Sequence, residues 1–250
     1  MARPEPRILT VTDSRRVTPN MHRVTLGGDG MAGFPRDQSG GYVKLMLPGA
    51  TDGKNIVRTY TIRSQSDSGI DVDFALHGSD EQSGPATSWA INAMVGDEIK
   101  VGGPGAAKPL PEGRGPFLLV GDMTALPAIL VNLEALPVDA TGDAIILIRD
   151  SDDKQDIAKP AGLNVHWIVD AALGVNPSML PDAARNIPAV DKCVYAWVAC
   201  EFEAMKLLRD YLRGEQKLGP DRLYISSYWK RGLVEDEHKL AKRAYADADA

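Results

Sequence analysis

The pattern of hydrophobic residues changes once along this 250-residue chain, and that change limits the folds it can adopt. Before about residue 110, apolar and polar residues alternate in short runs, as in strands that bury only one face. After about residue 116, continuous apolar runs alternate with helical stretches, as in a parallel sheet with helices on its faces. We therefore predict two domains, a β-barrel over residues 1–113 and an α/β domain over residues 114–250.

The first domain is expected to be a six-stranded antiparallel barrel with one helix near residues 86–94, because turn-forming glycines and prolines separate short alternating runs. Its strands are expected at 8–12, 21–26, 42–47, 58–63, 70–76 and 98–101.

Residues 106–116 are rich in proline and glycine and read as the linker, and the second domain is expected to follow it. Strands are expected at 117–120, 144–148, 165–169, 193–199 and 222–226, a turn at 121–124, and helices at 125–136, 201–216 and 235–250.

Composition excludes several classes of protein. A hydrophobic fraction of 44% and a charged fraction of 25% are those of a globular protein, and no window has the apolar length of a membrane span. A net charge of −6 argues against a general nucleic-acid binder. Cys193 and Cys200 flank one apolar run and, if it is a strand, lie about 23 Å apart, so we expect free thiols. We expect a cytoplasmic monomer without a signal peptide that binds neither membrane nor nucleic acid.

The segment Arg58-Thr59-Tyr60-Thr61 carries the first candidate site. Alternation places Arg58 and Tyr60 on one face of a strand, and Thr59 and Thr61 on the other. A guanidinium can bind a pyrophosphate with two hydrogen bonds, a phenol can stack on a ring, and a hydroxyl can contact a ring nitrogen. These side chains suit a flat anionic cofactor such as a flavin. The alternative is that the segment consists of ordinary β-forming residues and that Arg58 is a solvated surface charge.

A second candidate site follows at residues 73–78 and 84–90. Gly84-Pro85 opens a helix, so the first-turn N–H groups could face an anion. The alternative is a simple helix capped by Thr87 or Ser88, with His77 as a packed residue at the end of a strand.

Strand ends in the second domain supply further candidates. Residues 119–129 form a strand, a glycine turn and a helix start with Pro127 in the first turn, which suits either a phosphate site or an ordinary connection. Cys200 follows another strand and is either an active-site residue or a small core residue. Tyr228 and Trp229 are either a pair that covers a ring or part of the core.

Other chemistries find no support. The chain has no CxxC pair and no HExxH motif, and its four histidines are scattered, so we predict no metal site. It also lacks the GxSxG motif of a serine hydrolase.

Taken together and in order, these segments resemble the siderophore-interacting protein family, the flavin-dependent ferric-siderophore reductases within the ferredoxin-reductase-like superfamily. The resemblance covers nearly the whole chain. The matching segments are 58–61, 73–78, 84–90, 121–129, 197–201 and 228–232.

The resemblance implies that the barrel binds FAD. It implies that Arg58 pairs with the pyrophosphate, Tyr60 stacks on the isoalloxazine and Thr61 approaches the N5 edge, which makes Tyr60 and Thr61 the implied catalytic residues. The other implied FAD-binding residues are Thr59, Asp73, His77, Gly78, Gly84, Pro85, Ala86, Thr87 and Trp89.

The resemblance also implies that the α/β domain binds NADH or NADPH. Implied residues on the nicotinamide side are Asp122, Thr124 and Ala125, with Glu201, Tyr228 and Trp229 opposite. Three residues depart from the family pattern in this region: Met123 replaces Glu, and Cys200 and Ser227 each replace Gly. These departures leave the nicotinamide step open.

The sequence leaves the donor undecided, because Arg149 favours a 2′-phosphate and the adjacent Asp150 favours a free ribose hydroxyl. The implied function is a cytoplasmic reductase that passes electrons from NAD(P)H, or from ferredoxin, through FAD to a ferric siderophore and so releases Fe(II). The alternatives are a general ferredoxin or flavin:NAD(P)H reductase and a flavoprotein that binds siderophores without turnover.

Ferric siderophores are often anionic, so an acidic protein should offer local cations to them. The candidate substrate-binding residues are Lys44, Lys239, Lys242 and Arg243, each of which could instead be a solvated surface charge.

Overall fold

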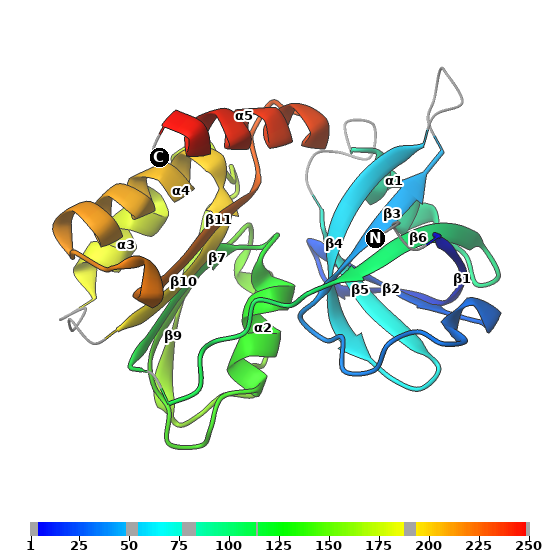
Figure 1. Ribbon diagram of the computed structural model, residues 1–250, viewed down its shortest axis with the longest axis horizontal. Helices are drawn as coiled ribbons and strands as arrows, with labels where there is room; N and C mark the ends of the chain where they lie inside the picture. The colour runs from blue at the N-terminus through cyan, green and yellow to red at the C-terminus, as the bar shows by residue number, and fades with distance from the viewer. Residues whose placement is uncertain (1–4, 49–54, 77–83, 114, 188–193, 249–250) are drawn as a thin grey trace. The chain divides into compact units, whose positions relative to one another are not determined.

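The computed structural model describes residues 5–48, 55–76, 84–113, 115–187 and 194–248. They form two compact units, Met1–Pro109 with Leu130–Asn132, and Leu110–Ile129 with Leu133–Ala250. The predicted fold class is confirmed, since the first unit is a closed antiparallel barrel and the second contains a parallel five-stranded sheet with helices (Figure 1).

The barrel strands are β1 (Arg7–Thr18), β2 (Met21–Gly27), β3 (Tyr42–Leu47), β4 (Ile56–Gln65), β5 (Gly69–Ala75) and β6 (Glu98–Gly105), in the spatial order β1-β2-β5-β4-β3-β6. The short helix α1 (Pro85–Asn92) lies between β5 and β6 in sequence, and the 3-10 turn η1 (Asp29–Met31) follows β2. The alternating apolar side chains fill the barrel, including Leu9, Val24, Val43, Ile62, Val72 and Phe74.

Three barrel strands are clearly longer than the sequence predicts. β4 gains two residues at each end and runs from Ile56 to Gln65. β1 continues to Thr18, past a register shift between Val11 and Asp13 that breaks the alternation on which the prediction rested. β6 continues to Gly105, through the glycines that were predicted to form a turn.

Strand β4 lies between β3 and β5. It pairs with β3 from Ile56 to Thr61, and its described register with β5 covers Ile62 to Gln65 and contains a shift between Ile62 and Ser64. The part of β4 that carries the Arg58–Thr61 motif is therefore hydrogen-bonded in register to β3.

The second unit has the strand order β11-β10-β7-β8-β9, with every neighbouring pair parallel. Its strands are β7 (Phe117–Asp122), β8 (Thr141–Ile148), β9 (Gly162–Val169), β10 (Tyr195–Glu201) and β11 (Leu223–Trp229). Its helices are α2 (Leu126–Glu134), α3 (Met179–Asn186), α4 (Phe202–Arg209) and α5 (Glu235–Ala248), with shorter turns η3 (Ser151–Asp153), η4 (Asp210–Glu215) and η5 (Pro220–Arg222).

One face of this sheet packs against α3 and α4, whose buried residues Leu180, Ala184, Met205 and Leu208 share a core cluster with Val120 and Val198 (Figure 1). The α3 helix was not predicted, because two prolines close to its start, Pro177 and Pro181, resemble loop sequence.

Three predicted boundaries in this unit are wrong. Gly121 and Asp122 continue β7 instead of forming a turn, and β11 extends to Trp229. The helix predicted over residues 201–216 begins after Glu201, which ends β10, and changes to a π-helix at Asp210. Strands β7 and β11 thus extend further toward the carboxyl edge of the sheet than their apolar runs predict.

Cys200 is a free thiol and fully buried in the core, while Cys193 lies outside the described residues. Within the described ranges, no helix is long and apolar enough to cross a membrane.

Candidate functional site

The β4 motif lies on two faces of the strand, as its alternation predicts. Arg58 and Tyr60 stand opposite Leu45 and Val43 of β3, whose side chains point into the barrel. Thr59 and Thr61 stand opposite Lys44 and Tyr42 on the outer face. The cation and the phenol therefore share the face that continues into the barrel core.

The Tyr60 ring rests on other aromatic side chains. Its centroid lies 4.3 Å from that of Phe74 on β5, and Phe74 lies 5.9 Å from Trp89 on α1. Phe74 is fully buried, whereas Tyr60 is half-buried. The core thus supports one side of the Tyr60 ring and fixes its orientation, while part of the ring stays accessible.

Arg58 is half-buried, and its Nη1 atom donates to the carbonyl of Val57 at 2.9 Å. Among the described residues no carboxylate pairs with this guanidinium. A guanidinium of this kind keeps most of its donors for an anionic ligand.

Helix α1 begins without a side-chain cap. Its N-cap is Gly84, Pro85 occupies the first turn, and the first helical bond is that of Ser88 N–H to Gly84 at 2.9 Å. Neither Thr87 nor Ser88 caps the helix, so that alternative is wrong. The amides of Ala86 and Thr87, in the first turn, are placed to face an anion.

Three other residues were predicted to bind FAD: Asp73, His77 and Gly78. His77 and Gly78 lie outside the described residues. Asp73 is buried and forms a two-bond ion pair with Arg23, with distances of 2.6 and 2.8 Å. The Asp73 carboxylate is therefore already engaged by a neighbouring strand.

In the second unit, the Asp122 carboxylate connects the ends of three strands. Oδ1 accepts bonds from the Thr124 backbone N–H and hydroxyl, at 2.9 and 2.6 Å. Oδ2 accepts bonds from Glu201 N–H and the Trp229 indole, at 2.8 and 2.9 Å. Burial raises the pKa of Asp122, and these four donors oppose that rise by favouring the ionised form.

Glu201 caps helix α4 and the turn after β11. Its Oε2 atom accepts the backbone N–H groups of Glu203 and Ala204, and its Oε1 atom accepts that of Arg231 at 3.2 Å. The structure therefore brings together Asp122, Thr124, Glu201 and Trp229 at the carboxyl edge of the sheet. Ala125 is buried beside them, and its N–H donates to the Asp122 carbonyl at 2.9 Å.

Tyr228 does not join this group. Its ring meets Trp197 edge-on at 6.5 Å, and burial raises the pKa of its phenol well above the usual value. The Trp229 indole instead donates to Asp122, and the register of β11 with β10 shifts between Ser227 and Trp229.

The three departures from the family pattern are buried. Met123, Cys200 and Ser227 are each no more than 3% exposed. Burial raises the pKa of the Cys200 thiol well above its usual value, which favours the core interpretation over a reactive thiol.

An open cleft of about 490 Å³ lies beside Glu201 and is lined by Gly174, Val175, Pro177, Glu201, Glu203, Lys230, Arg231 and Gly232. Gly174 borders one side of the cleft. Glycine is required there, because its φ is +76° and a Cβ would lie 2.7 Å from the Trp229 ring. The 174–177 loop has no recognisable sequence motif and was not predicted to belong to a site. Lys230 and Arg231 lie in the matched segment 228–232, but no role was predicted for them.

The cleft carries one cation beyond its internal ion pairs. Glu203 pairs with Lys230 at 2.9 Å and Lys206 at 3.0 Å, and the Lys230 bond is the main reason that the Glu203 pKa is lowered. Glu201 is occupied by backbone amides. Across the described residues no acidic side chain pairs with the exposed Arg231 guanidinium.

Asp150, one of the two residues expected to select the donor, is engaged locally. Asp150 accepts the Asp152 N–H at 2.9 Å, and Asp153 accepts the Asp150 N–H at 3.0 Å, so the pair caps its own 3-10 turn.

The candidate substrate cations lie in different settings. Lys242 of α5 donates to the Ser226 hydroxyl at 2.6 Å and to the Ser227 carbonyl at 3.2 Å, and burial lowers its pKa. Lys239 pairs with Glu235 at 2.8 Å, and Arg243 is exposed. Lys44 is half-buried on β3, on the outer face of the barrel.

Ser227 also contacts His238, whose Nε2 atom lies 2.8 Å from the Ser227 hydroxyl and whose ring packs edge-on against Phe202. His238 is 5% exposed. His238 and Lys242 therefore both link helix α5 to strand β11.

This contact predicts a loss of stability in acid. Burial, reinforced by Lys242, lowers the pKa of His238 below its usual 6.5, so the unfolded chain binds the proton more readily than the folded one. Stability from this group is present above pH 6.5 and declines as the pH falls below it. The melting temperature between pH 7.5 and 5.0 should fall less steeply in His238→Gln than in the wild type. Equal slopes would contradict this account.

Comparison with known proteins identifies the family. Residues 115–232 match the siderophore-interacting protein family, and residues 10–54 and 49–108 match the siderophore-interacting FAD-binding domain. The chain is 31% identical to the ferric vibriobactin reductase ViuB of Vibrio cholerae, over 98% of this chain and 96% of that protein. It is 27% identical to an NADPH-dependent ferric-chelate reductase of Escherichia coli, over 89% and 92% of the two chains.

Solved structures show the same relationship. The siderophore-interacting protein SipS of Aeromonas hydrophila superposes with a TM-score of 0.84 at 30% identity, over 97% of this chain and 98% of that one. A ferredoxin-NADP+ reductase of Plasmodium falciparum shares the fold, with a TM-score of 0.66 at 14% identity over 89% and 96% of the chains. The chain belongs to the siderophore-interacting protein family, with the fold of the ferredoxin reductases.

Proposed function

We propose that this protein is a flavin-dependent ferric-siderophore reductase that takes its electrons from NADPH and works in the cytoplasm. The observation that carries the proposal is the Arg58–Tyr60 face of β4, which lies in the unit that matches a siderophore-interacting FAD-binding domain. The relatives named as ferric-siderophore and ferric-chelate reductases support iron reduction as the outcome.

The residues of the barrel fit FAD. Arg58 offers a guanidinium without a carboxylate partner in the described structure, and the α1 N-terminus offers amides without a side-chain cap. Both favour a pyrophosphate. The half-buried Tyr60 ring, supported by Phe74, offers a plane for the isoalloxazine. Bound FAD would supply the redox chemistry that links a donor of two electrons to ferric iron, which accepts one electron at a time.

We propose further that Thr61 lies near the reactive edge of the flavin, and that Thr59, Gly84, Pro85, Ala86, Thr87 and Trp89 surround the rest of the cofactor. Asp122, Thr124, Ala125, Glu201 and Trp229 would shape the nicotinamide side. Asp122 acts there through the strand ends that it connects, because all four of its hydrogen bonds are made within the protein.

The donor is proposed to enter the cleft beside Glu201. Parallel α/β sheets bind nucleotides beyond the carboxyl ends of their strands, which is where this cleft lies. Arg231 is its cation without a carboxylate partner among the described residues and suits the 2′-phosphate that distinguishes NADPH from NADH. The E. coli relative is named NADPH-dependent.

The direct test is reduction of a ferric siderophore by the FAD-loaded protein under anaerobic conditions, with a ferrous chelator to trap Fe(II). One catecholate and one hydroxamate complex serve as probes. We expect Fe(II) to form with NADPH at a rate that depends on FAD, and more slowly with NADH. Flavin reduction without Fe(II) would indicate a general flavin reductase, and flavin that stays oxidised would contradict NADPH as donor.

Arg58→Ala tests the FAD site. Loss of a charge-assisted contact of about 1.5–3 kcal/mol should raise the dissociation constant for FAD roughly 10- to 100-fold. Fluorescence titration of the flavin-free protein measures it. Arg36→Ala, which removes an exposed arginine of the same unit, should bind FAD like the wild type. Similar values for the two variants would remove Arg58 from the site.

Arg231→Gln tests donor selection. We expect the KM for NADPH to rise about tenfold and that for NADH to stay unchanged, because only NADPH carries the extra phosphate. Lys154→Gln, an exposed cation of the same unit outside the cleft, is the control. An equal change for both donors would contradict a phosphate contact.

A further inference from the structure

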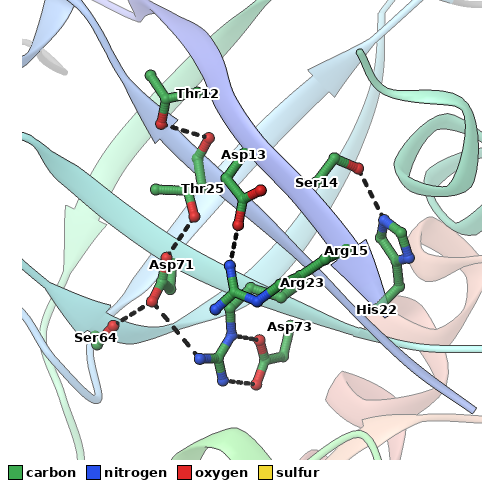
Figure 2. A network of polar contacts seen from close by, with 10 residues as sticks. All are labelled: Thr12, Asp13, Ser14, Arg15, His22, Arg23, Thr25, Ser64, Asp71 and Asp73. Atoms are coloured by element: carbon green, nitrogen blue, oxygen red, sulfur yellow. Dashed lines mark hydrogen bonds and ion pairs between the residues drawn. The ribbon is translucent and has the colours of Figure 1, made fainter. Parts of the chain in front are cut away.

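The outer face of the barrel carries a network of charged side chains that the proposed function does not use (Figure 2). It consists of Arg23 and Thr25 on β2, Asp71 and Asp73 on β5, and Ser64 on β4, and we refer to it as the barrel network. Arg23 donates from Nε and Nη2 to the two oxygens of Asp73, and its Nη1 lies 3.7 Å from Asp71.

Asp71 joins three strands. Its Oδ1 atom accepts the Thr25 hydroxyl at 2.7 Å and its Oδ2 atom accepts the Ser64 hydroxyl at 2.6 Å, while Asp71 itself belongs to the strand between them (Figure 2). The network therefore fixes the positions of β2, β5 and β4 relative to one another.

The barrel network is mostly shielded from water although it lies on the outer face: Asp73 is buried, and Arg23, Thr25, Ser64 and Asp71 are half-buried. The side chains of Asp73, Arg23 and Asp71 are 1%, 16% and 21% exposed. Removing charges from water is costly, and only a well-made set of bonds offsets that cost. The neighbouring pair Asp13–Arg15 is about half exposed and so carries much less of this constraint.

The network lies where β4 pairs with β5. Ser64 and Asp71 stand opposite each other in the register of β4 and β5, and the pair Ile62–Val72 ends that register. Beyond this point β5 continues with Asp73 and Phe74, and β4 continues toward Tyr60. The two rings meet there, with centroids 4.3 Å apart.

Asp73 and Phe74 are consecutive residues of one strand and point to opposite faces. The bonds from Arg23 hold Asp73 on the outer face of the barrel. They thereby hold the adjacent backbone from which the Phe74 ring extends into the core. Phe74 in turn supports Tyr60. The network can therefore act on the Tyr60 ring without contacting any ligand.

We propose that Asp71 and Asp73 are positioning residues for the flavin, acting through the Arg23 contact and the Phe74–Tyr60 ring contact. The inference rests on the proposed function, because it assumes that Tyr60 contacts FAD. It assigns Asp73 a different role from the direct FAD contact that the family resemblance implies.

The test compares Asp73→Asn with Asp13→Asn, which removes a carboxylate from the exposed pair on the same face of the barrel. The readouts are the dissociation constant for FAD and the fluorescence of the bound flavin, which an aromatic ring in contact quenches. Both are taken where circular dichroism shows a folded protein. We expect Asp73→Asn to weaken FAD binding about tenfold and to raise the bound-flavin fluorescence several-fold, with Asp13→Asn unchanged.

Two further variants separate positioning from general loss of stability. Phe74→Leu removes the ring under Tyr60 and should give the same rise in fluorescence. The exchange Arg23→Asp with Asp73→Arg restores opposite charges and should recover part of the FAD affinity. If Asp73→Asn does not fold, Ser64→Ala and Thr25→Val each remove one bond to Asp71 and should raise the fluorescence by a smaller amount.

Wild-type affinity and quenching in a folded Asp73→Asn protein, or in both Ser64→Ala and Thr25→Val, would overturn the inference and leave the proposed function intact. A wild-type protein that binds no FAD would overturn the proposed function, and this inference with it.

Discussion

The position of β4 between β3 and β5 is the constraint on which the flavin side of the structure depends. Within the described residues, β3 holds the Arg58–Thr61 segment in register along one edge, and β5 pairs with β4 along the other edge from Ile62 to Gln65. The aromatic side chains of Tyr60, Phe74 and Trp89 meet beside this segment and extend the barrel core to it. The motif is therefore held by a rigid strand and a packed core, which suits a site that must orient a large planar ligand.

Carboxylates with little exposure to water organise both units in the same physical way. Asp122 draws the ends of β7, β10 and β11 together by accepting four hydrogen bonds, and Asp71 links β2, β5 and β4 by accepting two hydroxyls. A carboxylate that loses its water can be stable only where several donors converge on it, so each fixes the geometry of the elements that supply those donors. Neither group needs to touch a ligand to shape a binding surface.

The sequence predicts the fold class and the number of strands correctly, because the change in hydrophobic period reports directly which faces are buried. Strand ends were placed less well, since Asp122 and Trp229 are polar or bulky and do not extend an apolar run. Periodicity cannot show that Asp73 pairs with Arg23, 50 residues earlier in the chain, or that the Trp229 indole donates to Asp122. The cleft beside Glu201 was also beyond prediction, because loop and strand residues far apart in sequence form it.

The central claim is that the barrel binds a flavin which NADPH reduces. The most direct measurement is the visible absorption spectrum of the purified protein reconstituted with FAD, before and after anaerobic addition of NADPH. We predict a bound-flavin spectrum that bleaches with NADPH, before any iron complex is added. A protein that stays colourless after reconstitution with FAD would contradict the account.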